Sequence, residues 1–466
     1  MERKVDVAII GAGTAGIAAT SQVRKSTDNF VLINGGAKGT TCARVGCMPS
    51  KCMIQAAMDY HARVKLAEEG TEGNGQVNLD HKEVMARVRT LRDGFVQGVI
   101  DGFIGPLADR FVEGYAEFLE PTLLQVNGDK LRSDKIVIAT GSRPLVPDKW
   151  TSFGKQILTT DNVFEQSELP KHAAVIGLGV IGLELGQAFH HLGVHVTGFD
   201  TLKHIGGLED PDVNQTAVDF FNKEFPIHLG NEARIEASGT QLAVIAGDAR
   251  VFVDKVLVSI GRTPNVEHLR LDRLGIDLDN KGLPPFNRET MQIGDLPIFI
   301  AGDVNGDRPI LHEASHEGQV AGYNASHTPI TSFKRKTPLS IAFCHPNICS
   351  VGKSWNEIRN SNPAVGTGEF SGGRAKILDR EYGIIKVYGD HETGRLLGAE
   401  MAAPRGEHLG HLLAWSIQNG QTVFDFLEVP FYHPTMEETL QSALKDLAGN
   451  LKHEGPPILG LAKKTS

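Results

Sequence analysis

A unit of strand, glycine loop and helix occurs twice in this sequence, and this repeat constrains the fold more than any other feature. Each copy begins with a short apolar run, at residues 5–10 and 173–176, that leads into the pattern G-x-G-x-x-G. After a helical segment, a second apolar run ends at a polar residue, Asn34 or Asp200, 23 residues after the first glycine. The repeat therefore predicts two βαβ units of the same design.

The glycines of the two loops indicate what such a unit binds. The first glycine makes a tight turn, the second lets the backbone approach a pyrophosphate, and the third packs the helix on the strand. The helix N-terminus then faces the anion with its free N–H groups. We therefore predict one dinucleotide on each copy. The predicted contacts are Gly11, Gly13 and Gly16 in the first copy and Gly177, Gly179 and Gly182 in the second.

The domain organisation follows from the remaining apolar runs. Three of them, at residues 136–139, 256–260 and 297–301, end in glycine turns of the kind that suits a domain crossing. After Lys336 the pattern changes to alternating segments and two helices. The predicted fold class is α/β, with two Rossmann-like dinucleotide-binding domains and a C-terminal α+β domain. The predicted boundaries are 1–150 and 269–335 for the two parts of the first domain, 151–268 for the second and 336–466 for the third.

The composition describes a folded and mildly acidic chain. Of its 466 residues 22% are charged and 41% hydrophobic, only five are cysteines, and the formal net charge is −9. These values exclude a disordered chain and a disulfide-stapled secreted scaffold. They also make nucleic acid and membrane surfaces poor partners, so a small-molecule substrate is expected. Because the chain begins with an apolar strand and shows neither a signal peptide nor a membrane-spanning stretch, we expect a cytoplasmic protein.

Two cysteines, Cys42 and Cys47, stand five residues apart in a chain whose compartment keeps thiols reduced. A regular helix would hold their Cα atoms about 8.6 Å apart, whereas a disulfide requires about 7 Å or less. Gly46 and Pro49 allow the distortion that a bridge needs. Cys47 precedes a predicted helix start and Lys51, both of which lower the pKa of a thiol. The spacing alone leaves open a redox-active pair or two buried, inert cysteines.

Two aspartates follow strands at the edge where an open α/β sheet binds ligands. At the position of Asp200 a carboxylate accepts a hydrogen bond from a ribose 2′-hydroxyl and repels a 2′-phosphate, so NAD is predicted rather than NADP. Lys203 and His204 keep NADP open, because a nearby cation can receive the phosphate. Asp303 is either a ligand contact or a residue that satisfies its own turn.

Seven motifs, in order along nearly the whole chain, resemble those of the flavoprotein disulfide reductases, the class I pyridine nucleotide-disulfide oxidoreductases. The redox segment of that family reads T-C-x-N-x-G-C-x-P-S-K, and residues 41–51 read T-C-A-R-V-G-C-M-P-S-K. The other motifs are residues 11–16, 139–144, 177–184, 261–265, 301–303 and 433–438. The resemblance implies FAD and NAD as cofactors and a homodimer built through the C-terminal domain.

The resemblance also implies roles for individual residues. Cys42 would be the interchange thiol that meets the substrate, and Cys47 would lie against the flavin as the charge-transfer thiolate. Lys51 would lie near flavin N5 and pair with Glu184, and Asp303 would bind the ribityl chain. The further cofactor contacts expected are Thr41, Thr140, Gly141, Gly302, Gly261 and Arg262.

His433 and Glu438 have an ordinary and a catalytic interpretation. Thr435-x-x-Glu438 is a capping box in front of an amphipathic helix, and a histidine there is more often packed or capping. The resemblance implies instead that His433 is the acid/base for the dithiol, is held by Glu438, and reaches Cys42 of the partner subunit. A dithiol with a pKa of about 8.5 is mostly protonated at neutral pH, so it requires such a base.

Three residues depart from the family pattern. Asn34 replaces a glutamate that holds the adenosine ribose of FAD, which exchanges a charged hydrogen bond of about 1.5–3 kcal/mol for a neutral one of about 0.5–1.5 kcal/mol. FAD binding is therefore expected to be weaker but retained. Thr40 replaces a glycine. Arg44 replaces an asparagine, and it either favours a thiolate or acidic substrate or is simply solvated.

The other cysteines carry no predicted chemistry. Cys52, Cys344 and Cys349 are expected to be small buried apolar residues. No Cys/His cluster has the spacing of a zinc site, so no metal is predicted. The chain has no additional C-terminal cysteine pair, which disfavours mercuric reductase and the large thioredoxin reductases.

The predicted function is oxidation of dihydrolipoamide by NAD through FAD and a Cys42–Cys47 redox disulfide. The cofactor preference and residues 433–438 are most similar to the dihydrolipoamide dehydrogenases, and the dithiol would be free or carried by a lipoyl domain. The first alternative is another NAD(P)H-dependent reductase of a low-molecular-weight disulfide. An alternative of another class is a non-catalytic flavin-binding subunit or redox-responsive scaffold.

Overall fold

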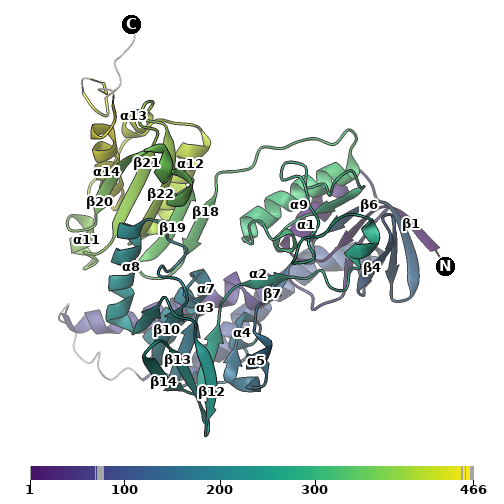
Figure 1. Cartoon of the computed structure of the whole chain (residues 1–466), viewed down its shortest axis with the longest axis horizontal. Coiled ribbons are helices and arrows are strands. Elements are labelled where there is room, and N and C mark those ends of the chain that lie inside the picture. The colour runs from purple at the N-terminus through teal and green to yellow at the C-terminus, as the bar shows by residue number, and fades with distance from the viewer. Residues whose placement is uncertain (1, 69, 71–77, 453–454, 457, 462–466) are drawn as a thin grey trace.

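The two copies of the repeated unit form the centres of two separate sheets (Figure 1). The structure, a computed structural model, describes residues 2–68, 70, 78–452, 455–456 and 458–461. The first sheet has the order β3-β2-β1-β6-β5-β4, and β17 also pairs with β6. Its strands are β1 (Glu2–Ile10), β2 (Phe30–Asn34), β3 (Phe111–Glu113), β4 (Ala116–Glu120), β5 (Leu123–Val126), β6 (Asp129–Ile138) and β17 (Ile298–Ile300).

The apolar run of β1 is buried on both faces of this sheet, as parallel strands require. Ile10 pairs in register with Ile33 of β2 and Ile138 of β6. Ile9 packs in one core with helix α1 (Thr14–Val23), whereas Ile10 belongs to the core of the opposite face. The first glycine loop therefore leaves the sheet at its carboxyl edge.

Helix α9 (Leu311–Ser326) packs very closely against α1, because glycines lie at the contact. A Cβ at Gly318 would lie 2.2 Å from the carbonyl oxygen of Ala15, and a Cβ at Gly322 would lie 2.4 Å from that of Ala19. Side chains at these two positions would push the helices apart. The close packing brings the start of α9 beside the first glycine loop.

The second sheet is entirely parallel, with the order β11-β10-β9-β15-β8. Helices α7 (Val180–His191) and α8 (Pro211–Glu224) follow β9 and β10. A three-stranded antiparallel sheet of β12, β13 and β14 packs on this domain. The strands are β8 (Ile157–Leu158), β9 (His172–Ile176), β10 (His195–Asp200), β11 (Ile227–Leu229), β12 (Arg234–Ser238), β13 (Gln241–Ala246), β14 (Ala249–Val253) and β15 (Lys255–Val258).

The chain crosses from the first sheet to the second after β6 and returns to the first with β17. An antiparallel ribbon of β7 (Ser142–Pro144) and β16 (Arg262–Pro264) joins the two crossings, at the glycine turns that the sequence indicated. Residues 1–150 and 269–335, the two predicted parts of the first domain, thus contribute strands to one sheet. The boundaries at residues 150, 268 and 335 remain predictions.

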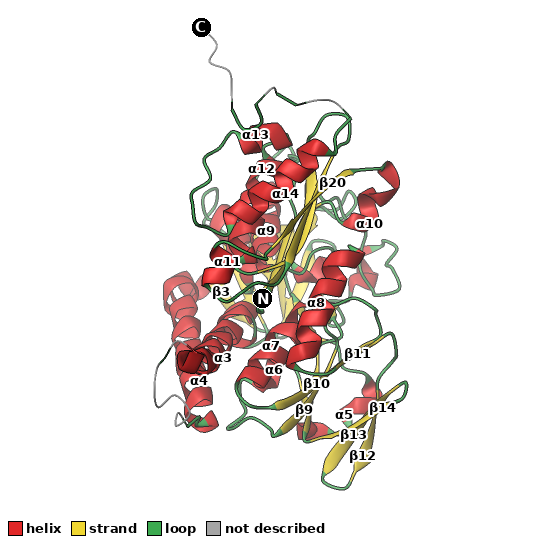
Figure 2. Cartoon of the chain, turned by 90° about the vertical axis from the view of Figure 1, so that its left-hand side faces the viewer, coloured by secondary structure: helices red, strands yellow, loops and turns green. Residues whose placement is uncertain are grey.

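Two long helices, α3 (Cys47–Glu68) and α4 (His81–Val99), pack side by side (Figure 2). Helix α3 also packs against α7, so it links the two nucleotide domains. A π-helix (Ile100–Ile104) and a 3-10 helix (Gly105–Arg110) continue from α4. Further short helices of the described residues are α5 (Asp148–Thr151), α6 (Thr160–Val163), α10 (Trp355–Ile358), α11 (Arg374–Ile377) and the 3-10 turns Gly154–Gln156, Leu271–Leu274, Asp303–Asn305 and Arg359–Ser361.

The C-terminal domain is an antiparallel sheet with the order β18-β19-β22-β21-β20. Its residues alternate between two cores: Ile385 packs with helices α12 and α14, and Ile384 packs toward α8 of the second domain. The predicted fold class is confirmed. The elements are β18 (Leu339–Ala342), β19 (Asn347–Gly352), β20 (Ala364–Glu369), β21 (Ile384–Gly389), β22 (Leu396–Ala403), α12 (Gly406–Gln418), α13 (Val423–Leu427) and α14 (Glu437–Gly449).

Candidate active site

The first and third glycines of both loops are required by close backbone contacts. A Cβ at Gly11 would lie 2.2 Å from the carbonyl oxygen of Ala139, and a Cβ at Gly177 would lie 2.5 Å from that of Ser259. Both glycines also have positive φ, 110° and 96°. The third glycines, Gly16 and Gly182, would place a Cβ only 1.8 and 1.9 Å from the carbonyl oxygen of the first glycine. These four glycines serve the packing of loop, strand and helix.

The second glycine of each loop is different, because it faces open space. A Cβ on Gly13 or Gly179 would meet no atom within 4 Å, and both residues line the same cavity. The backbone there is open to a ligand, and it caps the N-terminus of α1 or α7 without a side-chain hydrogen bond. This is the geometry that a pyrophosphate needs.

The polar residues that end β2 and β10 occupy equivalent places. The Oδ1 atom of Asn34 accepts a hydrogen bond from the N–H of Ala12 at 3.3 Å, and Oδ2 of Asp200 accepts one from the N–H of Leu178 at 2.6 Å. The Oδ1 atom of Asp200 accepts another from the N–H of Leu202 at 2.9 Å. Asn34 thus makes the corresponding loop contact with a neutral side chain, and Asp200 makes it with a charged one.

Asp303 lies at the end of β17 in a small polar group at the domain crossings. The hydroxyl of Ser142 donates to Oδ2 of Asp303 at 2.7 Å, and Nε of Arg262 donates to the Ser142 hydroxyl at 2.7 Å. Arg262 and Asp303 form an ion pair at 3.7 Å. The sequence interpretation missed Ser142, although this residue directly follows Gly141 in the predicted crossing turn.

The two cysteines lie on different helices, separated by a break at Gly46. Cys42 belongs to α2 (Thr41–Val45), and Cys47 is the first residue of α3. A Cβ at Gly46 would lie 3.0 Å from the carbonyl oxygen of Thr41, so a larger residue would crowd the break. The predicted distortion of this segment is therefore present. It brings the two thiols, both free in this structure, within hydrogen-bonding distance of each other.

This contact shifts the pKa values of the two thiols in opposite directions. The hydrogen bond with Cys42 is the largest cause that lowers the pKa of Cys47 to about 7, against the effect of burial, and the Lys51 ammonium lowers it further. The hydrogen bond with Cys47, followed by burial, raises the pKa of Cys42 well above its ordinary value. The directions of the two shifts favour Cys47 over Cys42 as the sulfur that carries negative charge, in keeping with its predicted role.

Lys51 and Glu184 form an ion pair next to Cys47. The Lys51 Nζ atom lies 2.8 and 2.7 Å from the two carboxylate oxygens of Glu184, a side chain that is 5% exposed. The backbone N–H of Phe343 also donates to Glu184 at 2.9 Å, and Lys51 Nζ lies 4.7 Å from the centre of the Phe343 ring. Phe343 follows β18, so all three domains meet at this ion pair. No local sequence pattern predicts the contact between Phe343 and Glu184.

One large cavity of about 820 Å³ joins these groups, and its volume is in the usual range of cofactor sites. It extends from the first glycine loop past the cysteines to the second loop. The predicted site residues that line it are Gly13, Thr41, Cys42, Cys47, Lys51, Gly141, Gly177, Gly179, Glu184, Asp200, Gly261, Arg262, Gly302 and Asp303.

The other predicted contacts do not line this cavity. Gly11, Gly16 and Gly182 support the loops from behind, and Asn34 contacts the backbone of the first loop. Thr140 donates its hydroxyl to the carbonyl oxygen of Asn265 at 2.7 Å, so it ties the two crossings together.

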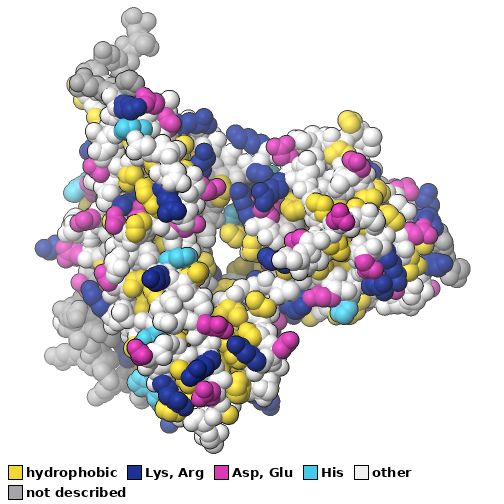
Figure 3. Space-filling model, in the orientation of Figure 1, with side chains coloured by type: hydrophobic (Ala, Val, Ile, Leu, Met, Phe, Trp, Pro, Cys, Tyr) yellow, Lys and Arg dark blue, Asp and Glu magenta, His cyan; other side chains and the backbone are white. Residues whose placement is uncertain are grey.

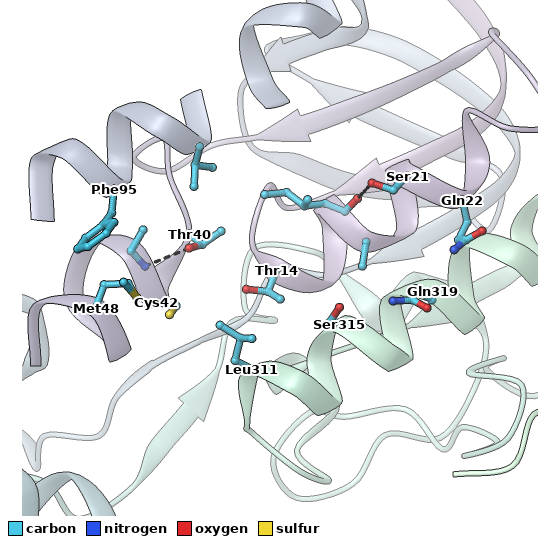
Figure 4. Close-up of a pocket in the computed structure, with 14 residues that line it drawn as sticks. Thr14, Ser21, Gln22, Thr40, Cys42, Met48, Phe95, Leu311, Ser315 and Gln319 are labelled. Carbon is cyan, nitrogen blue, oxygen red and sulfur yellow. Dashed lines mark hydrogen bonds between the residues drawn. The ribbon is translucent and has the colours of Figure 1, made fainter. Parts of the chain in front are cut away.

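A second cavity, of about 520 Å³, opens on the other side of Cys42 (Figure 4). We call it the outer groove, and Figure 4 shows Cys42, Met48 and Phe95 at one end, Thr14 in the middle, and Ser21, Gln22 and Gln319 at the other end. Cys47 does not line it. Every lining residue is uncharged: Thr14, Ile17, Ala18, Ser21, Gln22, Thr40, Cys42, Ala43, Met48, Phe95, Val99, Leu311, Ser315 and Gln319.

His433 lies away from both cavities within one chain. Its side chain is 78% exposed, and Nδ1 lies 2.9 Å from Oε1 of Glu438. The expected capping box is only half formed: Glu438 accepts from the N–H of Thr435 at 3.0 Å, but the Thr435 hydroxyl donates to the carbonyl oxygen of Tyr432. Helix α14 accordingly begins at Glu437.

The structure explains one of the residues that depart from the family pattern, Thr40. Thr40 caps α2, because its hydroxyl accepts from the N–H of Ala43 at 3.1 Å. Arg44 lines neither cavity. Its aliphatic part packs beside Gly39, and its buried Nε finds no hydrogen-bond partner among the residues that the structure describes. Cys344 and Cys349 are buried, and Cys52 is half-buried.

The described residues contain neither a membrane-spanning helix nor a group of metal ligands. No helix among them is both long enough and apolar enough to cross a bilayer. In the same part of the chain, no three His, Cys, Asp or Glu side chains gather into a group that could hold a metal ion.

The residues present fit two dinucleotides. Two glycine loops leave their helix N-termini open, each is followed by a strand-end polar residue, and both border one cavity with a thiol pair between them. Gly13 and Asp303 would hold FAD, and Gly179 and Asp200 would hold NAD.

Comparisons with known proteins agree with this geometry. Residues 5–318 match the family "Pyridine nucleotide-disulphide oxidoreductase", and residues 339–444 match its dimerisation domain. The chain is 31% identical over 449 residues to a dihydrolipoyl dehydrogenase of Chlamydia pneumoniae, which covers 94% of this chain and 96% of the relative. It is 30% identical to a dihydrolipoyl dehydrogenase of Bacillus subtilis, with 96% and 99% covered.

Among solved structures, the fold is similar to the HOCl-induced flavoprotein disulfide reductase RclA of Escherichia coli. The TM-score is 0.82 at 22% identity, and the match covers 95% of this chain and 99% of that one. The likeness extends over both nucleotide domains and the C-terminal domain. The chain therefore belongs to the pyridine nucleotide-disulphide oxidoreductase family, whose enzymes use FAD and NAD.

Proposed function

We propose that this protein oxidises dihydrolipoamide to lipoamide with reduction of NAD. The observation that carries the proposal is the position of Cys42, which lines both the outer groove and the inner cavity, whereas Cys47 lines only the inner cavity. A dithiol in the groove would therefore meet Cys42, while Cys47 faces the space for the dinucleotides. The pair can connect the two spaces chemically.

The outer groove favours an uncharged substrate. Its lining offers apolar surface from Phe95, Val99 and Leu311 and neutral hydrogen-bonding groups from Gln22 and Gln319. Glutathione carries carboxylates and coenzyme A carries phosphates, and recognition of such groups normally uses Arg, Lys or backbone nests. The lipoyl arm is an apolar chain with an amide, which matches this lining.

The proposed reaction begins with a thiolate of dihydrolipoamide that attacks the Cys42 sulfur of a Cys42–Cys47 disulfide. The bond between the two cysteines breaks, and Cys47 leaves as a thiolate, in keeping with its lowered pKa. The second substrate thiol then attacks the mixed disulfide, which releases lipoamide and leaves Cys42 reduced. FAD bound at Gly13 and Asp303 would supply the two-electron chemistry that links the cysteine pair to NAD.

The other predicted site residues would hold the cofactors or stabilise the Cys47 thiolate. Lys51 would stabilise the Cys47 thiolate, and Glu184 would hold Lys51 in place. FAD would contact Gly13, Thr41, Gly141, Gly302 and Asp303, with Asn34 and Thr140 supporting the loops, and NAD would contact Gly179, Asp200, Gly261 and Arg262. We also propose the domain boundaries and the cytoplasmic location that the sequence predicts.

The substrate thiols need a base, and we assign this role to His433 of a partner subunit. The dimerisation domain of this family supports a homodimer. His433 is exposed and is fixed by Glu438, so it is available to reach the outer groove of a second copy. A lipoyl group carried on a protein domain is the proposed physiological partner.

Steady-state kinetics with a panel of substrates tests the proposal. Dihydrolipoamide plus NAD should turn over far faster than NADH with glutathione disulfide or coenzyme A disulfide. Turnover with a charged disulfide but not with dihydrolipoamide would support another disulfide reductase instead. Full activity in a Cys47→Ala variant would indicate that the thiols are dispensable, as the scaffold alternative requires.

A further inference from the structure

A single arginine holds three carboxylates behind the inner cavity. Arg335 Nη2 lies 2.8 Å from a carboxylate oxygen of Glu313 and 2.8 Å from one of Glu317, and its Nη1 lies 3.4 Å from Asp307. We call these four residues the Arg335 cluster. The side chains of Glu313 and Glu317 are 2% and 0% exposed, and that of Arg335 is 15% exposed. Such a buried cluster is costly to leave partly unpaired.

Glu317 connects this cluster to the turn that follows β17. Its Oε2 atom accepts a hydrogen bond from the backbone N–H of Gly302 at 2.8 Å and another from Nδ2 of Asn305 at 2.7 Å. Its other oxygen, Oε1, is the one that pairs with Arg335. One carboxylate therefore holds both ends of the 302–305 turn.

The first residue of the turn has a backbone conformation that glycine adopts more readily than other residues. Gly302 has φ of 80°, and a Cβ there would lie 2.9 Å from the Cβ of Ala15 at the start of α1. Gly302 and Asp303 line the inner cavity, but Glu317 and Arg335 do not. The two buried residues can thus act on a ligand only through the turn.

Arg335 also lies in the connection to the C-terminal domain. After α9 the chain runs back over this helix and crosses to β18 (Figure 1), and a space-filling view shows an opening between the two lobes beneath it (Figure 3). Arg335 fixes this connection to α9 through Glu313 and Glu317. The connection and the cavity turn therefore share one anchor.

We propose that Glu317 and Arg335 are positioning residues for FAD, which hold the Gly302–Asp303 turn in the form that contacts the cofactor and make FAD retention depend on the connection to the dimerisation domain. The inference rests on the proposed placement of FAD at this turn. Burial, the largest cause, raises the pKa of Glu317, while the Gly302 N–H and Arg335 oppose this shift.

Four variants of the full-length holoprotein test the inference. Glu317→Gln and Arg335→Gln each remove the charged link, and Arg335→Lys keeps the charge but not the fork that bridges several carboxylates. Arg288→Gln is the matched control, because Arg288 pairs with Oδ1 of Asp307 at 2.8 Å and its side chain is 69% exposed. FAD affinity is measured by removing the flavin and titrating it back while following flavin fluorescence.

We expect the dissociation constant of FAD to rise about tenfold to a hundredfold in Glu317→Gln and Arg335→Gln, less in Arg335→Lys, and within about twofold in Arg288→Gln. At saturating FAD, the visible spectrum and reduction potential of the flavin should shift in Glu317→Gln but not in Arg288→Gln.

Wild-type FAD affinity in Glu317→Gln and Arg335→Gln, with only a lower melting temperature, would overturn the inference and leave a purely structural role. Should Glu317→Gln fail to fold, Arg335→Lys decides, and unchanged FAD affinity in that variant also overturns it. Neither measurement uses a dithiol, so failure here is distinguishable from failure of the proposed lipoamide activity.

Discussion

Lys51 and Glu184 form a two-pronged ion pair that joins helix α3, which begins at Cys47, to helix α7 of the second nucleotide domain. The two charges act on Cys47 in opposite directions, because the ammonium lowers the pKa of the thiol and the carboxylate raises it. The pair thus adds two opposing effects to that of the Cys42 hydrogen bond on the Cys47 thiol, and it links the two nucleotide domains. This arrangement gives the first two predictions.

The thiolate of Cys47 should appear near neutral pH. The pKa of Cys47 is lowered to about 7, chiefly by the hydrogen bond from Cys42. Its thiolate therefore predominates above this pH and is lost as the pH falls below it. We expect NADH-reduced protein to show a long-wavelength thiolate–flavin band that decays as the pH is lowered through about 7. A band unchanged between pH 8 and pH 5.5 would contradict this assignment.

Substitutions in the ion pair should move this titration in opposite directions. Lys51→Met should raise the pKa of Cys47, and Glu184→Gln should lower it, because each removes one of the two opposing charges. The measurement is the rate of Cys47 alkylation against pH, read by mass spectrometry. Lys82→Met is the control, since Lys82 forms an exposed ion pair with Glu168 at 3.8 Å. Equal shifts in all three variants would rule out a local charge effect.

The glycine loops allow binding to be separated from folding. Gly179 has open space where a Cβ would lie, whereas a Cβ at Gly182 would lie 1.9 Å from the carbonyl oxygen of Gly177. We therefore expect Gly179→Ala to keep its melting temperature but lose NAD affinity about tenfold or more. Gly182→Ala should lower the melting temperature itself. Calorimetry of unfolding and NAD titration check both, and a stable Gly182→Ala protein with wild-type NAD affinity would contradict the contact geometry.

The sequence predicted the parts of this molecule that depend on local patterns. The repeated glycine loops, the strands that precede them and the break at Gly46 follow from short-range rules, because turn geometry and hydrophobic periodicity are set by neighbouring residues. The half-formed capping box at Thr435 shows the limit of such rules. There the hydroxyl donates backward to Tyr432 instead of capping the helix.

The parts that could not be predicted join residues far apart in the chain. The contact of Phe343 with Glu184 spans 159 positions, and that of Ser142 with Asp303 spans 161. Phe343 and Glu184 meet only after separate domains have assembled, and Ser142 and Asp303 come from two parts of one domain that the second nucleotide domain separates in the sequence. The uncharged lining of the outer groove could not be predicted either, since its residues come from four separate segments of the chain.

The last prediction concerns His433 and Glu438. The hydrogen bond with His433 is the largest cause that lowers the pKa of Glu438, followed by the Thr435 N–H, so the carboxylate stays charged and orients the imidazole. If His433 is the base for the dithiol, His433→Gln should reduce dihydrolipoamide turnover about 10²- to 10⁴-fold. Glu438→Gln should reduce it less, because the base remains but loses its orientation.

Electron transfer from NADH to ferricyanide should be unchanged in both variants, since this reaction needs no proton from the dithiol. His408→Gln is the matched control, because His408 also pairs with a glutamate, Glu407, and its side chain is 68% exposed. Mixed dimers decide whether the histidine acts across the interface. If each His433 serves the partner's groove, a heterodimer of Cys42→Ser and His433→Gln chains regains one complete site and recovers activity. Mixed dimers as inactive as both parents would place His433 and Cys42 in the same subunit's site.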